Sequence, residues 1–266
     1  MPCAKPYPNN NCAKCVRYEA TQKHNFLILA YKVYMHIVRR TYRQASVLIA
    51  ISQELYHLLK SIGYNNVVYL PNPVEIPNLN STNKMNESGL VNIGFFGQLK
   101  DYKGVQFLPM IAKRFPDAMF HVAGWGPLRN WLIKESAKYR NVVFHGYLSG
   151  ENLSNYIRSL DIVLFPSICS EACPGTVLEA FAYQKPVICF DLGGQAELIK
   201  LSKGGLLAKP FSINDLCDKI KILISDPIRR VELGLNGRKW VVQNCSPEKH
   251  SEALINIYKS LIFHLY

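Results

Sequence analysis

The sequence predicts an α/β protein whose main unit is a doubly wound parallel sheet. Short apolar segments alternate with helical patterns from Leu90 onward, and this alternation is typical of parallel strands joined by crossover helices. A separate strand–helix–strand pattern covers residues 46–70, ahead of a polar, turn-rich stretch. At 266 residues, the chain can hold one large or two modest domains.

We expect four parts along the chain: an incomplete N-terminal unit (1–74), a linker (75–89), a complete doubly wound domain (90–245), and a C-terminal helix that packs back on the N-terminal part (246–266). The N-terminal unit contributes strands at 46–50 and 67–70, with a helix at 53–62 between them. Ser52 suits the start of that helix and Gly63 its end.

A helix is also predicted over residues 26–44, with basic side chains on one stripe. Those side chains belong to Lys32, His36, Arg39, Arg40 and Arg43. A basic amphipathic helix can lie on an anionic membrane surface. Its apolar residues can equally pack within its own domain, so both interpretations stay open.

The main domain is expected to alternate six strands with helices. The strands are 91–96, 119–123, 142–145, 162–165, 187–190 and 205–208, and the helices that follow them include 105–115, 151–159, 176–183, 195–200, 213–225, 227–243 and 247–262. Ligands of such sheets bind beyond the carboxyl ends of the strands. The loops 97–104, 124–127 and 166–175 all lie there.

The segment from Pro166 to Glu197 contains the most informative pattern in the chain. A loop ending in Pro174-Gly175-Thr176 enters a helix, whose free N–H groups and dipole favour a phosphate. Glu171 and Glu179 lie on either side of this helix start. Two carboxylates around a phosphate seat suit a ligand with a central diphosphate and hydroxyl-rich sugars at both ends, which describes a nucleotide-sugar.

This segment resembles the donor-site signature of the retaining glycosyltransferases of family 4. The resemblance implies a GT-B-like α/β fold with a complete Rossmann-like C-terminal domain and, in this chain, a partial N-terminal one. It also implies that Glu171 contacts the transferred sugar and that Glu179 contacts the nucleotide ribose. Pro174, Gly175, Thr176 and Val177 would form the seat for the donor diphosphate.

The loop from Gly97 to Gly104 is a second predicted donor-binding element. Family members commonly carry an Arg after the first Gly and a Lys before the last, and both hold the diphosphate. Lys103 matches the Lys, Gln98 occupies the Arg position, and Lys100 is a substitute for the missing charge. Gly124 matches a family glycine turn, and either ligand approach or a purely structural turn explains it. His145 to Leu148 aligns with the segment that lines the base pocket.

By this resemblance, Glu171 and Lys103 are the expected catalytic residues. Lys103 and the N–H groups around Gly175–Val177 would stabilise the departing diphosphate. No metal and no other cofactor is expected, since family members generally need none and the sequence lacks an Asp-x-Asp motif. Glu197 also matches a family position, although a Glu near a helix start needs no role beyond complementing the dipole.

The predicted function is retaining transfer of a hexose from a nucleotide diphosphate sugar to a glycan, lipid or small acceptor. Family members carry more of the N-terminal domain than this sequence does. Three explanations stay open: a truncated coding frame, a complementary chain that supplies the missing acceptor-side half, or a reduced protein that binds nucleotide-sugar without efficient transfer. The alternative is a non-catalytic nucleotide-sugar-binding subunit, or a truncated remnant that needs a partner chain.

Composition and charge limit the remaining classes. The formal net charge is +12, which favours anionic partners, yet no nucleic-acid-binding motif is present and no nucleic acid partner is expected. Cys3, Cys12 and Cys15 hint at metal binding with His24 nearby, and the other cysteines lie in or beside apolar runs rather than forming a disulfide framework. No signal peptide or membrane-length apolar run is visible, so we expect a cytoplasmic protein, peripheral at the inner membrane face.

Overall fold

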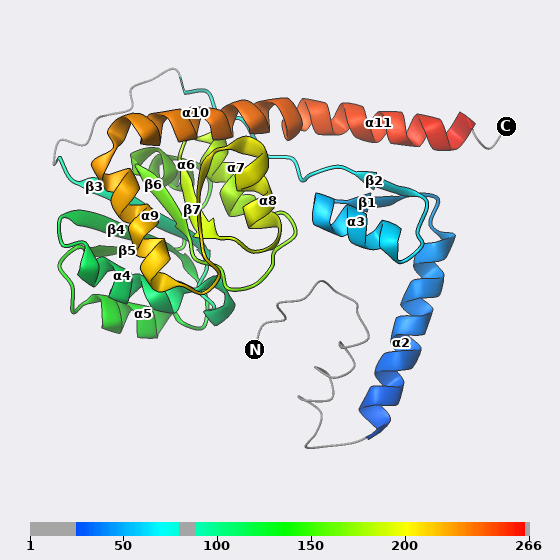
Figure 1. Ribbon diagram of the computed structural model, residues 1–266, viewed down its shortest axis with the longest axis horizontal. Helices are drawn as coiled ribbons and strands as arrows, with labels where there is room; N and C mark the ends of the chain where they lie inside the picture. The colour runs from blue at the N-terminus through cyan, green and yellow to red at the C-terminus, as the bar shows by residue number, and fades with distance from the viewer. Residues whose placement is uncertain (1–24, 80–88, 264–266) are drawn as a thin grey trace.

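The main domain is built on a six-stranded, fully parallel sheet (Figure 1). The computed structural model describes residues 25–79 and 89–263. The strands are β3 (Val91–Gln98), β4 (Ala118–Trp125), β5 (Val142–Gly146), β6 (Ile162–Phe165), β7 (Val187–Phe190) and β8 (Gly205–Ala208). Their order is β5-β4-β3-β6-β7-β8, so the direction in which successive strands are added reverses between β3 and β6. This is the doubly wound topology that the sequence predicts.

Strands β3 and β4 are longer than the sequence pattern predicts. Their register runs from Val91 opposite Ala118 to Gln98 opposite Trp125. The prediction ended these strands at Phe96 and Ala123, where glycines follow. The parallel ladder continues through those glycines, which places the predicted loop residues Gly97 and Gln98 at the end of a strand.

Helices cover both faces of the sheet. They are α4 (Leu108–Arg114), α5 (Arg129–Ser136), α6 (Gly150–Ser159), α7 (Gly175–Ala182), α8 (Gly193–Ser202), α9 (Ile213–Ser225) and α10 (Pro227–Asn244). Several helix boundaries differ from the prediction, and two helix starts illustrate this. The expected helix at 105–115 begins with the 3₁₀ turn η2 (Val105–Phe107) after another, η1 (Asp101–Lys103), and α8 begins at Gly193 rather than at residue 195.

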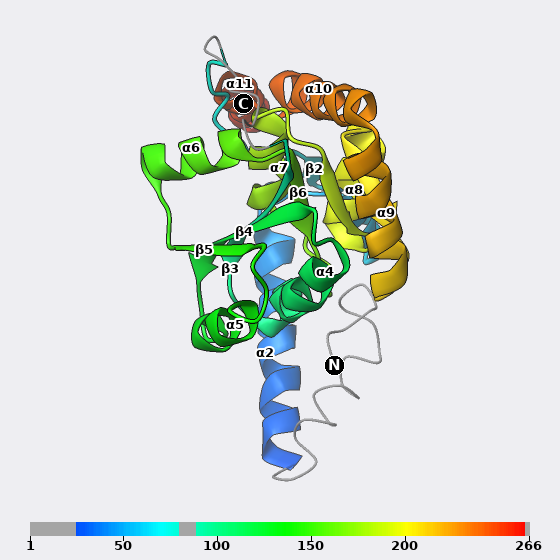
Figure 2. The same cartoon turned by 90° about the vertical axis from the view of Figure 1, so that its left-hand side faces the viewer.

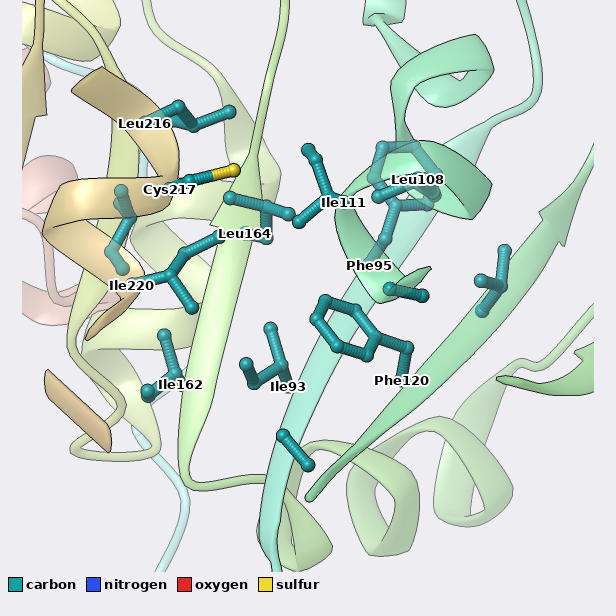
Figure 3. Packing of buried hydrophobic residues seen from close by; sticks show 14 of the residues in the cluster. Ile93, Phe95, Leu108, Ile111, Phe120, Ile162, Leu164, Leu216, Cys217 and Ile220 are labelled. Carbon is teal, nitrogen blue, oxygen red and sulfur yellow. The ribbon is translucent and has the colours of Figure 1, made fainter. Parts of the chain in front are cut away.

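Two hydrophobic clusters, one on each face, hold these layers together. On one face, Ile93, Phe120 and Leu164 of the strands meet side chains of α4 and α9, as Figure 3 shows. On the other face, Val163, Phe165 and Cys189 pack with residues of α6, α7 and α8. Alternate residues of each strand point to opposite faces, so the strands bury both sides and read as continuous apolar runs.

The N-terminal part forms a separate, smaller unit. It contains α2 (Asn25–Gln44), β1 (Leu48–Ala50), α3 (Gln53–Ser61) and β2 (Val67–Tyr69), and the two strands pair in parallel. Its core is a small cluster around Ala50, Tyr64 and Val67. Helix α2 projects away from the rest of the molecule in both views (Figures 1 and 2).

The last helix, α11 (Pro247–Phe263), continues from α10 and reaches the N-terminal unit's connecting segment. The Val74 N–H donates to the Cys245 carbonyl at 2.8 Å, and His250 Nδ1 lies 3.0 Å from the Pro71 carbonyl oxygen. The segment that follows β2 is therefore hydrogen-bonded to the junction between α10 and α11. No helix among the described residues has both the length and the apolar content needed to cross a membrane.

Candidate functional site

The predicted site residues gather where the strand order reverses, between β3 and β6. The loop after β3 and the loop after β6 are hydrogen-bonded to each other: the Ile168 N–H and the Ser167 hydroxyl both donate to the Tyr102 carbonyl, at 2.9 and 3.1 Å. Ligands of open parallel sheets bind at such a point, outside the carboxyl ends of the strands. The topology therefore brings together the two loops that the sequence singled out.

Gly124 has a structural reason to be glycine. Its φ is +150°, and a Cβ added there would lie 1.9 Å from the carbonyl oxygen of Gly97 on the neighbouring strand. Any larger residue would push the ends of β3 and β4 apart. This close contact supports the structural interpretation of the glycine turn, and the same residue also lines the cavity described next.

A cavity of about 740 Å³ opens at the carboxyl ends of β3, β4 and β5. It is lined by these residues from the predicted donor site: Gly97, Gln98, Gly124, Thr176 and Glu179. Lys100, which the sequence suggested as a replacement for a missing Arg, lines it too. Lys103 and Glu171 lie outside this lining.

Two exposed aromatic side chains line the same cavity. Tyr147 belongs to the segment 145–148 that the sequence expected at the base pocket, whereas Trp125 was not singled out. Trp125 is 65% exposed and Tyr147 is 71% exposed, although large aromatic side chains usually bury most of their surface. The Arg129 guanidinium lies 5.5 Å from the Trp125 ring centroid. The available signal for both residues was an aromatic side chain immediately after a glycine at the end of a strand, Gly124 in β4 and Gly146 in β5.

Helix α7 begins at the loop after β6, as predicted, and its first N–H groups point out of the helix. Gly175 and Thr176 are its first two residues, and among the described residues no acceptor is found for either N–H. The Val177 N–H instead donates to the Pro174 carbonyl at 3.1 Å. Of the three predicted phosphate-binding amides, two are therefore available for a ligand.

Glu179 lies on the second turn of α7 and is partly buried at the cavity wall. Burial raises the pKa of its carboxyl group above the usual value, because the charged form loses hydration. Hydrogen bonds accepted by the carboxylate would stabilise its charged form in place of the lost hydration. Hydroxyl groups of a ligand in the cavity would provide them.

Glu171 and Lys103, the two predicted catalytic residues, form an ion pair. The Lys103 ammonium lies 2.7 Å from Glu171 Oε2, and each side chain is 18% exposed. The ammonium also lies 5.5 Å from the centroid of the Phe165 ring. The second carboxylate oxygen, Oε1, is buried and has no hydrogen-bond partner among the described residues. Such an oxygen is costly unless a donor reaches it, which indicates a place for a ligand hydroxyl.

Gln98, at the position where family members carry Arg, has its side chain hydrogen-bonded to Tyr102. The Tyr102 hydroxyl donates to its side-chain oxygen at 3.1 Å. The side chain has no charge to offer a diphosphate. Lys100, two residues further on, reaches the same cavity and supplies positive charge there.

The Glu197 carboxylate hydrogen-bonds to the start of another helix, and not to the first turn of α8, on which it lies near the N-terminal end. Its two carboxylate oxygens accept the N–H groups of Gln53 and Glu54, at 2.7 and 3.0 Å, and so cap the first turn of α3 in the N-terminal unit. The sequence suggested that Glu197 needs no role beyond complementing a helix dipole. The dipole it complements belongs to a helix 143 residues away along the chain.

Metal binding by the N-terminal cysteines falls outside the described part of the chain, because Cys3, Cys12, Cys15 and His24 precede Asn25. Within residues 25–79 and 89–263, no group of three or more His, Cys, Asp or Glu side chains is arranged to hold a metal ion. The five cysteines described there are all free thiols.

Comparison with known proteins identifies relatives over most of the main domain. The family model described as "Glycosyl transferases group 1" matches residues 82–240, which is more than half of the chain. An uncharacterized glycosyltransferase of Methanocaldococcus jannaschii is 30% identical over 174 residues, covering 62% of this chain and 44% of the relative. The 2-deoxystreptamine glucosyltransferase of Streptomyces kanamyceticus is 28% identical over 176 residues, or 64% and 45% of the two chains.

The chain thus spans about half the length of the curated relatives that it matches. Among solved structures, the Anabaena protein HepE in complex with UDP superposes with a TM-score of 0.70 at 20% identity. The match covers 81% of this chain and 64% of that one. At this level of identity, the likeness establishes a shared fold.

Proposed function

The chain belongs to the glycosyl transferases group 1 family and has a GT-B-like fold, and from this premise we propose that it transfers a hexose from a nucleotide diphosphate sugar. The transfer proceeds with retention of the anomeric configuration, as the resemblance to family 4 implies. The acceptor is a glycan, a lipid or a small molecule. The 2-deoxystreptamine glucosyltransferase among the relatives supports a hexose as the transferred group.

One observation carries this proposal: the start of α7 separates two carboxylates with different surroundings. Glu179 lies at the wall of the cavity, and Glu171 lies outside the cavity lining beside the ammonium of Lys103. In the proposed complex, the nucleoside occupies the cavity and Glu179 accepts its ribose hydroxyls. The diphosphate lies at Gly175 and Thr176, and the hexose reaches the unpartnered oxygen of Glu171. The UDP bound by the HepE structure supports a nucleotide ligand.

The proposed chemistry depends on stabilising the departing diphosphate. Negative charge builds up on the phosphate oxygens as the sugar–phosphate bond breaks, and preorganised donors lower the barrier by several kcal/mol. Lys103 and the two available amides of α7 are such donors, and Lys100 adds charge from the cavity side. With these groups the transfer needs no metal ion, and none is proposed.

Donor hydrolysis tests this function without knowledge of the acceptor. The purified chain is incubated with UDP-glucose, GDP-mannose and ADP-glucose, and the anomer of the sugar first released is read by NMR. Release of the α-anomer from an α-linked donor is expected. Release of the β-anomer would contradict the retaining mechanism.

A second candidate function is a nucleotide-sugar-binding subunit that works with a complementary chain. It is favoured by the N-terminal unit, where β1 and β2 form a two-stranded parallel sheet among the described residues and Ile49 of β1 is 38% exposed. Parallel sheets are normally larger and covered on both faces. Saturable donor binding without hydrolysis by the isolated chain would favour this candidate over the enzyme.

We also propose a cytoplasmic location at the inner membrane face, with α2 on the lipid surface. Arg40 and Arg43 are exposed on this helix beside the exposed apolar residues Tyr34 and Ile37. Anionic lipids attract such a surface by about 1 kcal/mol per basic residue. Replacing Arg39, Arg40 and Arg43 together should abolish sedimentation with phosphatidylserine vesicles. Unchanged sedimentation would refute this location.

A further inference from the structure

The first turn of α8 packs against the loop that carries Glu171. This loop, residues 166–174, contains no helix or strand, so its conformation depends on contacts from elsewhere. The Gly194 N–H donates to the Glu171 carbonyl at 2.6 Å. A Cβ on Gly194 would lie 1.7 Å from the Ala172 carbonyl oxygen, so only glycine permits this approach.

Gln195, the next residue, is fully buried, with 0% of its surface exposed. Its side-chain oxygen accepts the Glu171 N–H at 3.2 Å, and its side-chain nitrogen donates to the Cys169 carbonyl at 2.9 Å. The amide thus pairs with the N–H and C=O of two residues in the loop, as a neighbouring strand would. A buried amide is costly unless both ends are paired, and here both partners belong to the Glu171 loop.

Together these contacts leave Glu171 with a single unpartnered polar atom. Gln195 holds its N–H, Gly194 holds its C=O, and Lys103 holds Oε2. Only Oε1, which is buried, has no partner among the described residues. The surrounding protein therefore holds both backbone polar groups of Glu171 and leaves Oε1 open to a ligand hydroxyl.

We propose that Gln195 is a positioning residue for the transfer reaction, which holds the backbone of Glu171 so that Oε1 meets the transferred sugar. The proposal rests on the proposed function, in which Glu171 contacts the sugar. Gln195 itself touches neither the sugar nor the nucleotide. Its effect is expected on the discrimination between a nucleoside diphosphate and its sugar conjugate, and not on the affinity for the nucleotide alone.

Hydrogen exchange tests the positioning without any ligand. In Gln195→Met, which keeps the size of the side chain but loses both hydrogen bonds, the Glu171 amide should exchange about tenfold faster or more. The control is Ser202→Ala on the last turn of α8, where the hydroxyl accepts the Gly204 N–H at 2.9 Å. It removes one buried hydrogen bond from the same helix and should leave the Glu171 amide unchanged. Equal exchange in wild type and Gln195→Met would overturn the proposal.

Calorimetry then tests the link to the sugar. The ratio of dissociation constants is measured for UDP against UDP-glucose, GDP against GDP-mannose and ADP against ADP-glucose. Gln195→Met and Glu171→Gln should each shift this ratio in the same direction, and the double variant should add nothing further. Independent, additive shifts would mean that Gln195 does not act through Glu171.

The experiments distinguish failure of the proposed function from failure of the proposal for Gln195. If no nucleotide binds to the folded wild-type chain, the proposed function fails, while the exchange rates still decide whether Gln195 fixes the loop. If Gln195→Met does not fold, NMR of the wild-type chain decides the same point. The Gln195 side-chain amide protons should exchange slowly and show a nuclear Overhauser effect to the Glu171 amide proton. Rapid exchange of those protons would overturn the proposal.

Discussion

At the scale of single residues, the pairing of Glu171 with Lys103 is the most consequential contact in the candidate site. The same ammonium is proposed to bind the donor diphosphate, so the carboxylate and the phosphate compete for it. The distance of 2.7 Å between Lys103 Nζ and Glu171 Oε2 makes this ion pair a strong, charge-assisted hydrogen bond. The low exposure of both side chains limits screening of the pair by solvent. Donor binding must therefore rearrange this pair.

Glu171→Gln should separate catalysis from nucleotide binding. Loss of the carboxylate removes the group proposed to contact the sugar, so transfer or hydrolysis should fall on the order of 100-fold or more. Affinity for the nucleoside diphosphate should stay the same or rise, because Lys103 loses its charged partner. Turnover and calorimetry measure the two effects, with Glu151→Gln on α6 as an exposed control. Equal losses in both quantities would contradict the assigned role.

The sequence could place some site residues and not others, for a physical reason. Gly97, Thr176 and Glu179 line one cavity because parallel strands end at the same edge of a sheet, and that edge follows from the strand pattern. The Lys103–Glu171 pair and the Gln195 bonds depend on side-chain conformations across loops that are distant in sequence. No local spacing encodes those contacts. The roles proposed for these residues in binding and catalysis stay predictions.

At the scale of elements, α8 connects the candidate site to the N-terminal unit. Its first turn holds the Glu171 loop through Gln195, and Glu197, two residues further along the helix, caps α3. Residues two apart on a helix point in different directions, so the N-terminal end of α8 can contact both neighbours. The position of α3 is therefore linked to the main domain through a charged cap.

Removing this cap should weaken α3 and leave the main domain folded. Glu197→Ala deprives the Gln53 and Glu54 amides of their acceptors, with an expected cost of about 1–2 kcal/mol. Hydrogen exchange of those two amides should accelerate, whereas amides of β6 and β7 should not change. Glu197→Gln, which keeps one acceptor oxygen, should show a smaller effect. Unchanged exchange at Gln53 and Glu54 would show that the cap does not operate in solution.

Strands β4 and β5 carry a second side-chain pair with a measurable consequence. His121 Nδ1 lies 3.0 Å from His145 Nε2, and His121 Nε2 lies 3.1 Å from the Asn92 amide oxygen. An amide oxygen only accepts, so His121 carries its proton on Nε2 and its Nδ1 accepts from His145. Burial, with the neighbouring His145 as a second cause, lowers the pKa of His121 to about 4. Burial also lowers the pKa of His145.

Stability should therefore fall as the pH falls from about 6.5 towards 4. In this window the unfolded imidazole binds a proton that the folded one does not, so acidification favours unfolding. For the partly exposed His121, the loss at pH 5 should be on the order of 1–2 kcal/mol after allowance for screening. Urea unfolding at pH 7.5 and 5 measures it, with His121→Gln as the variant expected to reduce the difference. The same difference in both proteins would contradict this origin.

The sequence predicted element boundaries correctly where a polar or turn residue ends an apolar run. The prediction was wrong where a strand continues through glycines. The limits of β6, β7 and β8 agree with the prediction, because their apolar runs stop at polar or turn residues. β3 and β4 continue through glycines, since the ladder between them tolerates residues without a side chain. The prediction also treated η2 as the start of a regular helix.

At the scale of the whole molecule, the main domain and the N-terminal unit differ in completeness. The six-stranded sheet has helices on both faces and two hydrophobic clusters. The described N-terminal unit has two strands, one small cluster and a projecting helix with exposed apolar side chains. The alternating pattern of the sequence predicted the doubly wound domain, and the fold confirms it. The proposed domain limits and the complementary chain stay predictions, because contacts to other polypeptides leave no periodic pattern in one sequence.

The most direct test of the central claim is calorimetric titration of the purified chain with UDP, GDP and ADP. We expect saturable binding of one nucleotide, weakened at least tenfold in Glu179→Ala because the partly buried carboxylate would no longer accept the ribose hydroxyls. That result would establish a working donor site and identify the base. A folded chain that binds none of the three, or that binds equally well without Glu179, would contradict the proposed donor site.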